Sequence, residues 1–103
     1  MSDLGFPFRP YHPGELLKEE LEYRHISQKA FAKQLGVPYT AFNEVLNSKR
    51  PVSSELALLI EAALGVPAYM LVGMQTDYNL QVASQDKTFA KRLAKIRQIA
   101  AML

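Results

Sequence analysis

The chain of 103 residues contains no cysteine. It can therefore form no disulfide framework, no thiolate metal site and no cysteine nucleophile. No apolar run approaches the ~18 residues that a membrane-spanning helix needs, and no basic N-terminal region precedes an apolar core as in a secretory leader. These absences lead us to expect a soluble, cytoplasmic protein without a membrane partner.

The sequence patterns of known catalytic sites are also missing. There is no G-x-S-x-G motif, no glycine loop that would cradle a phosphate, and no pair of carboxylates in an apolar setting. His12, Glu15 and Glu19 have the spacing of metal ligands on a helix, but a capping histidine above a solvated acidic face explains them better. We expect no enzyme, no bound metal and no cofactor.

Positive charge is scarce outside the C-terminal end of the chain. Residues 1–85 carry seven Lys or Arg against nine Asp or Glu, whereas residues 86–103 carry five against one. A net positive charge favours polyanionic partners such as nucleic acid. That argument applies here only to the C-terminal segment, so the rest of the chain must be judged residue by residue.

Helical patterns follow one another along the chain without any strand-like alternation, which predicts an all-α fold of five to six helices. Residues 1–11 contain two prolines, one glycine and no periodicity, as expected of an N-terminal arm. Residues 12–83 are expected to form one domain, with His12, Ser27 and Ser53 as helix caps. Leu59 of the fourth helix and Val82 of the fifth are expected to point inward.

The tetrapeptide LGVP occurs twice, at residues 35–38 and 64–67. In each copy glycine can end one helix in a left-handed conformation and proline can begin the next. The helices around the first copy are short and closely connected, which predicts a steep crossing and a helix-turn-helix at about residues 27–47. The small side chain of Ala32 suits such a crossing. A plain corner between two helices remains the alternative.

The helix after the first LGVP has an apolar face at Phe42, Val45 and Leu46, so its polar side chains are expected to point outward. In a helix-turn-helix this second helix enters the major groove of DNA. The side chains that we expect at a DNA interface are Gln28, Lys29, Tyr39, Thr40, Asn43, Glu44, Asn47, Lys49 and Arg50. Within this set, Thr40 and Asn43 have the chemistry for base readout.

The remaining polar and basic side chains suit phosphate contacts, with Lys49 and Arg50 in the loop after the helix as the strongest candidates. Glu44 is the exception, because a carboxylate near phosphates is repelled unless it is paired. It can accept a hydrogen bond from a cytosine amine, or it can pair with a nearby cation such as Lys49.

Several motifs resemble the XRE-type helix-turn-helix of HigA-like antitoxins over about residues 11–83. They are HPGE at residues 12–15, Ser27-Gln28, the LGV turn, LN-x-KRP-V-S at residues 46–53, and MQ-x-x-YNL at residues 74–80. The resemblance implies a lambda-repressor-like fold that binds double-stranded operator DNA as a homodimer. It also implies that the protein represses its own operon and neutralises a RelE/HigB-type ribonuclease toxin. Many relatives carry arginine in place of Tyr39 and Glu44, and glycine in place of Ser48.

Residues 86–103 are expected to form a basic amphipathic helix that matches only part of that family. Its apolar residues recur on average every 3.5 positions, the spacing of a packed-helix seam. Contact with a second copy or a partner through Phe89, Leu93 and Ile96 is one interpretation; a solvated face and a phosphate-binding face are the others. For the whole protein, the alternatives to an antitoxin are a stand-alone XRE-family regulator and a protein-interaction module that has lost DNA binding.

Overall fold

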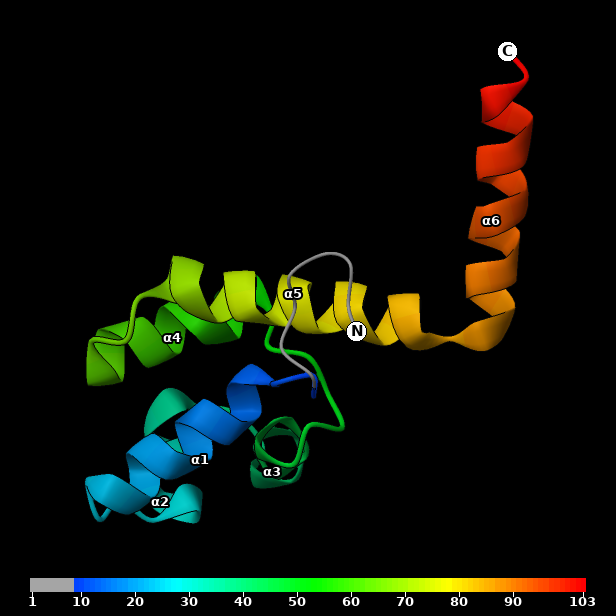
Figure 1. The fold of residues 1–103 in the computed structure, drawn as a ribbon. Helices are drawn as coiled ribbons and strands as arrows, with labels where there is room; N and C mark the ends of the chain where they lie inside the picture. Colours follow the sequence, from blue (N-terminus) through cyan, green and yellow to red (C-terminus); the bar gives the residue numbers. More distant parts are fainter. Residues whose placement is uncertain (1–8) are drawn as a thin grey trace.

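A computed structural model describes residues 9–103, and within that range it contains helices and no strands (Figure 1). The helices are α1 (Pro13–Tyr23), α2 (Gln28–Leu35), α3 (Tyr39–Leu46), α4 (Ser54–Leu64), α5 (Ala68–Gln85) and α6 (Lys87–Ala101). The prediction of an all-α fold is therefore confirmed. Most of the expected N-terminal arm, residues 1–8, lies outside the described residues.

The helices begin at the predicted capping residues. The side chains of Ser27 and Ser53 each accept a hydrogen bond from the backbone N–H three residues further on, at 3.2 and 3.1 Å. His12 caps α1 in the same manner through Nδ1, which accepts from the N–H of Gly14 at 2.8 Å. Such bonds satisfy amide groups that a helix leaves without partners in its first turn.

Both copies of LGVP perform the same local function. Gly36 ends α2 with φ of +74°, and Gly65 ends α4 with φ of +77°. This left-handed conformation costs glycine little because it has no Cβ atom. The following prolines, Pro38 and Pro67, each stand directly before the next helix.

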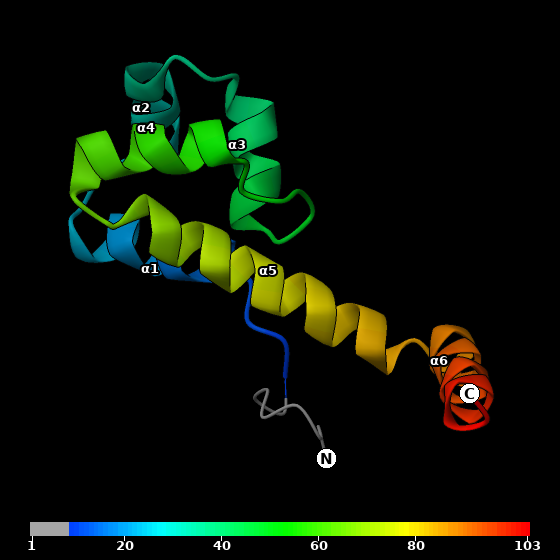
Figure 2. The same ribbon diagram turned by 90° about the horizontal axis from the view of Figure 1, so that it is seen from above.

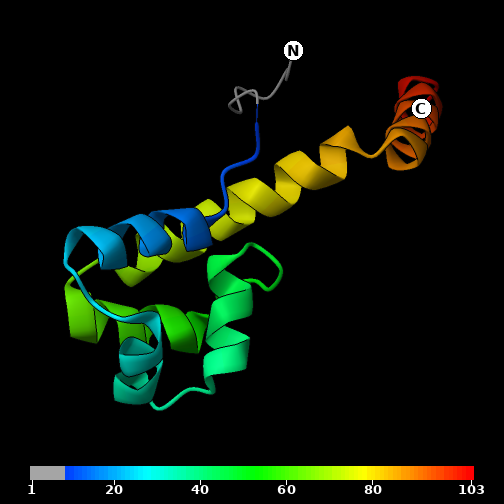
Figure 3. The same ribbon diagram turned by 90° about the horizontal axis from the view of Figure 1, so that it is seen from below.

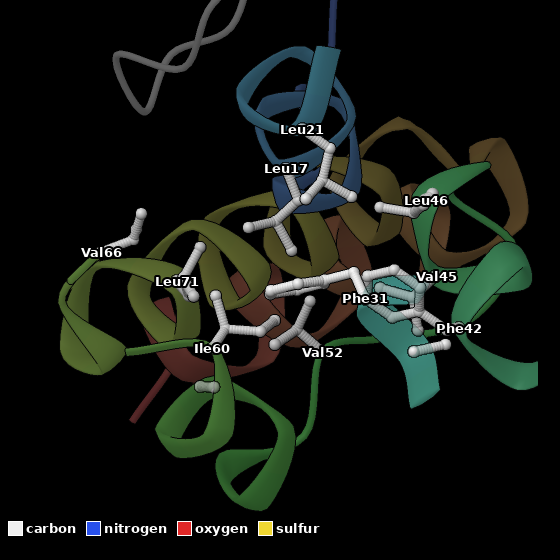
Figure 4. Packing of buried hydrophobic residues seen from close by; sticks show 12 residues of the cluster. Leu17, Leu21, Phe31, Phe42, Val45, Leu46, Val52, Ile60, Val66 and Leu71 are labelled. Atoms are coloured by element: carbon white, nitrogen blue, oxygen red, sulfur yellow. The ribbon is translucent and has the colours of Figure 1, made fainter. Parts of the chain in front are cut away.

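Helices α1 to α5 share one apolar core (Figure 4). The rings of Phe31 and Phe42 lie 5.7 Å apart at its centre. Ala32 is fully buried, in agreement with the expected close crossing of α2 and α3. The buried apolar residues are Leu17, Leu21, Phe31, Ala32, Phe42, Val45, Leu46, Val52, Ala57, Ile60, Val66 and Leu71.

Two of the inward orientations expected from sequence are wrong. Leu59 is 40% exposed and Val82 is 44% exposed. On α4 the buried positions are Ala57 and Ile60, which turns Leu59 toward solvent. On α5 a glutamine, Gln75, takes a buried position that an apolar pattern alone does not predict.

Helix α6 stands apart from the other five. Among the described helices its packing partner is α5, and α6 turns away from the C-terminal end of α5 (Figures 1 and 2). None of its residues is buried. The molecule is accordingly elongated, with principal extents of 56 × 23 × 23 Å. Within residues 9–103, no helix is both long enough and apolar enough to span a membrane.

Candidate nucleic-acid interface

Helices α2 and α3 form a two-helix unit joined by the short turn at Gly36. Figure 1 looks nearly along α3, whereas α2 lies across the view. Phe42, Val45 and Leu46 are buried, as predicted from the pattern of α3. The polar side chains of α3 are consequently left on its outer surface, where a ligand as large as a DNA duplex can reach them.

The N-terminal end of α3 lies beside the N-terminal end of α2. The ammonium group of Lys29 is 5.6 Å from the centre of the Tyr39 ring, a cation–π contact between the two helices. Thr40 is exposed next to this pair, and Gln28 is half-buried at the first position of α2. The structure thus brings together four of the expected residues at the N-terminal end of α3: Gln28, Lys29, Tyr39 and Thr40.

The C-terminal end of α3 and the loop after it carry the other expected phosphate contacts. Lys49 and Arg50 are both exposed in this loop. Arg50 donates two hydrogen bonds to Oε1 of Glu44, from Nη2 at 2.6 Å and from Nε at 3.0 Å. The cation that Glu44 pairs with is therefore Arg50 and not Lys49, because Arg50 reaches back over the last turn of α3.

Asn43 on α3 and Asn47 at its C-cap are hydrogen-bonded to each other. Asn47 Nδ2 donates to the carbonyl oxygen of Asn43 at 2.9 Å and to its Oδ1 at 3.2 Å. Asn47 Oδ1 accepts from Nζ of Lys18 at 3.2 Å, which ties it to α1. The side chain of Asn43 is bound through Oδ1, whereas that of Asn47 is bound through both Nδ2 and Oδ1.

The two basic ends of this surface are separated by the length of α3. Eight residues of α-helix span ~12 Å, and the major groove of B-DNA is ~12 Å wide. Lys29 lies beside the N-terminal end of α3, and Lys49 and Arg50 follow its C-terminal end. The two residues expected from sequence to read bases, Thr40 and Asn43, lie on α3 between these ends.

Electrostatics at the start of α1 are governed by local ion pairing and burial. The carboxylate of Glu15 accepts two hydrogen bonds from Arg9, at 2.9 and 3.1 Å, and this contact lowers the pKa of Glu15. Burial lowers the pKa of His12. Tyr11 donates to Glu19 at 3.1 Å. The potential ligand atoms of His12, Glu15 and Glu19 are thus engaged with neighbours in the chain.

The residues expected to contact a second copy or a partner lie far from α2 and α3, on α6. Phe89 is 40% exposed and Ile96 is 57% exposed, and Leu93 is half-buried. These side chains share one face of a helix that has few contacts with the rest of the chain. They form an apolar surface separate from the candidate nucleic-acid interface.

Sequence reasoning missed the roles of two residues that shape this interface, Lys18 and Gln75. Lys18 holds Asn47, and Gln75 accepts a hydrogen bond from the backbone of the loop after α3. Ser48, which follows the C-cap Asn47 of α3, has φ of +63°, in the left-handed region that favours the glycine that many relatives carry there. One signal for Gln75 was available, since it lies four residues after Leu71 and three before Tyr78, on the inward stripe of α5.

Comparison with known proteins identifies the same region. A helix-turn-helix family model matches residues 17–71. Virulence-associated protein I of Dichelobacter nodosus is 39% identical over 77 residues, which are 74% of this chain and 71% of that protein.

Two solved structures have a similar fold. One is an addiction-module antidote protein of the HigA family from Coxiella burnetii, with a TM-score of 0.76 and 30% identity over 85% of this chain and 95% of that one. The other is the Pseudomonas aeruginosa antitoxin HigA, solved with the higBA promoter. It has a TM-score of 0.70 and 28% identity over 92% of this chain and 96% of that one.

Proposed function

The chain belongs to the XRE-type helix-turn-helix family, and we propose that it is a transcriptional repressor that also acts as the antitoxin of a type II toxin–antitoxin pair. The family is one of DNA-binding regulators and not of enzymes. We propose that the repressor acts in the cytoplasm on the operator of its own operon, and that it neutralises a RelE/HigB-type toxin encoded beside it.

The observation that carries the DNA-binding part of this proposal is the composition of the α2–α3 surface. Base-reading side chains, Thr40 and Asn43, lie between Lys29 at one end of α3 and Lys49 with Arg50 at the other. Basic groups that flank a groove fix the register of a protein on DNA, and the side chains between them supply sequence specificity. The structural neighbour from Pseudomonas aeruginosa, solved with promoter DNA, supports the same use of this fold.

We further propose that the protein binds DNA as a homodimer and that α6 supplies the contact between the copies. Phe89, Leu93 and Ile96 lie on one face of α6, and none of them is buried within residues 9–103. A dimer places two recognition helices on successive major grooves, which matches a palindromic operator. Domain 12–83 would then bind DNA, while residues 86–103 would join the copies.

The toxin part of the proposal is tested by co-expression with the product of the neighbouring gene. We expect that product to arrest growth alone, to be harmless beside this chain, and to co-purify with it. Repression of a reporter by this chain, without any effect on a neighbouring gene product, would contradict the antitoxin role and identify a stand-alone regulator.

The ion pair between Glu44 and Arg50 favours a second candidate, a protein-interaction module that has lost DNA binding. The pair occupies one of the few cations on the α2–α3 surface. A gel shift with the DNA upstream of the gene separates the two candidates. A specific shift supports the repressor, whereas a folded protein that shifts no DNA supports the interaction module.

A further inference from the structure

Two motifs that are distant in the sequence meet at the loop of residues 47–53, which carries Lys49 and Arg50. They are HPGE at residues 12–15 and MQ-x-x-YNL at residues 74–80. The loop follows α3 and lies beside α5 (Figures 2 and 3). Buried polar side chains from the start of α1 and from the middle of α5 reach its backbone. These side chains lie behind the candidate nucleic-acid interface, where they cannot touch DNA themselves.

His12 holds the loop from the side of α1. Its side chain is 1% exposed, and its ring packs edge-on against Tyr78 with the centroids 4.8 Å apart. Because Nδ1 accepts the hydrogen bond from Gly14, the proton of the neutral ring is on Nε2. A hydrogen bond with the backbone of Arg50 raises the pKa of His12, against the lowering by burial. A backbone carbonyl oxygen is the group that can accept the Nε2 proton.

Gln75 holds the loop from the side of α5. Its side chain is 6% exposed, and Oε1 accepts from the N–H of Val52 at 2.9 Å. Its other side-chain group, Nε2, donates to Oδ1 of Asn79 at 3.0 Å. Within residues 9–103 no buried side-chain nitrogen or oxygen lacks a hydrogen-bond partner. The attachment of the loop is therefore made of fully paired polar groups, as buried polar groups require.

Gly14 places α1 directly on the last turn of α3. A Cβ atom at this position would lie 1.9 Å from the carbonyl oxygen of Val45, a distance that no real contact permits. The close approach sets His12, two residues earlier, within reach of the loop. The C-terminal end of α3 and the loop after it are thus fixed by the same two elements, α1 and α5.

We infer that His12 and Gln75 are positioning residues for DNA binding, which act by holding the backbone that carries Lys49 and Arg50. An ordered loop presents its cations to phosphates without a further loss of conformational freedom on binding. Since this inference rests on the proposed function, its test needs one measurement on DNA and one on the free protein.

The test compares the variant Gln75→Leu with Ile60→Val, which also weakens the core that contains Val52 but removes no hydrogen bond to the loop. For each protein the affinity for DNA is measured at several salt concentrations. We expect Gln75→Leu to flatten the salt dependence by about one to two units, one for each lost phosphate contact. Ile60→Val should keep the wild-type slope. In a chain that already lacks both cations (Lys49→Ala with Arg50→Ala), Gln75→Leu should flatten the slope no further.

The second variant is His12→Asn, because asparagine can still cap α1 but is too short to reach Arg50. It should flatten the slope as Gln75→Leu does. In the free protein, amide exchange at residues 49–52 should be faster in both variants than in Ile60→Val. Should the wild type bind no DNA, the proposed function fails, and amide exchange still tests the hold on the loop. Unchanged exchange, or a slope loss shared by Ile60→Val, would overturn the inference.

Discussion

Replacement of Glu44 by glutamine tests how the ion pair with Arg50 affects DNA binding. The two side chains are joined by hydrogen bonds of 2.6 and 3.0 Å, and both are partly exposed. When DNA binds, a phosphate must compete with Glu44 for the guanidinium of Arg50. The variant Glu44→Gln removes the negative charge and keeps the shape, so Arg50 becomes available to DNA.

The size of the effect follows from the exposure of the pair. Arg50 is 54% exposed and Glu44 is 40% exposed, so solvent screens their attraction. Exposed pairs of this kind contribute ~0.2–1 kcal/mol, which corresponds to a ~1.5- to 5-fold gain in affinity for any DNA sequence. One additional phosphate contact steepens the dependence of log K on log salt by ~0.9 units. Folding stability should fall by no more than ~1 kcal/mol.

Fluorescence anisotropy with a random duplex and an operator duplex, each at four salt concentrations, measures both quantities. Asp77→Asn is the matched control because Asp77 is exposed on α5, away from α2 and α3, and the substitution changes the net charge equally. We expect both duplexes to gain affinity with Glu44→Gln and neither to gain as much with Asp77→Asn. Equal effects of the two variants would refute a local role for Glu44, and a loss confined to the operator would show that Glu44 reads a base.

Four further predictions follow from the fold. Ser48→Gly should raise the free energy of unfolding by ~1 kcal/mol, because Ser48 is left-handed with φ of +63°; urea denaturation that shows no gain would contradict this. Phe42→Ala should cost ~3–5 kcal/mol, since Phe42 is 1% exposed in the core; a loss below 1 kcal/mol in thermal unfolding would be inconsistent with that packing. Burial holds the pKa of His12 below its ordinary 6.5. As the pH falls, His12 is therefore protonated in the unfolded chain before it is protonated in the folded protein. Stability should therefore decline as pH falls below ~6.5, and less steeply in His12→Asn. Ile96→Asp should convert a dimer to a monomer in light scattering, and an unchanged mass would remove α6 from the interface.

The helix boundaries and turns could be predicted because their causes are local. Ser27, Ser53 and His12 cap helices with their own side chains, and Gly36 and Gly65 end helices through their own backbone conformation. None of these requires knowledge of what lies across the core. The inward face of α3 was predictable for a similar reason, since its apolar residues recur with the period of one helix.

Contacts between distant segments could not be predicted in the same way. The partner of Glu44 depends on how the loop turns back over α3, and the burial of Gln75 depends on a backbone N–H from another part of the chain. Leu59 and Val82 were expected inside because an apolar stripe does not tell a core from an exposed apolar surface. The structure resolves these cases, since it shows which elements cover each face.

The central claim is that α3 of this chain reads a DNA sequence, and competition binding measures that most directly. The protein is titrated onto labelled DNA from upstream of its gene, with an excess of unlabelled random DNA, for the wild type and for Asn43→Ala. The account predicts salt-sensitive binding that survives the competitor in the wild type, and a loss of ~1–3 kcal/mol in Asn43→Ala on the operator alone. Two results would contradict sequence reading by α3. Unlabelled random DNA could compete for the folded wild-type protein as well as unlabelled operator does, or the folded protein could bind neither DNA.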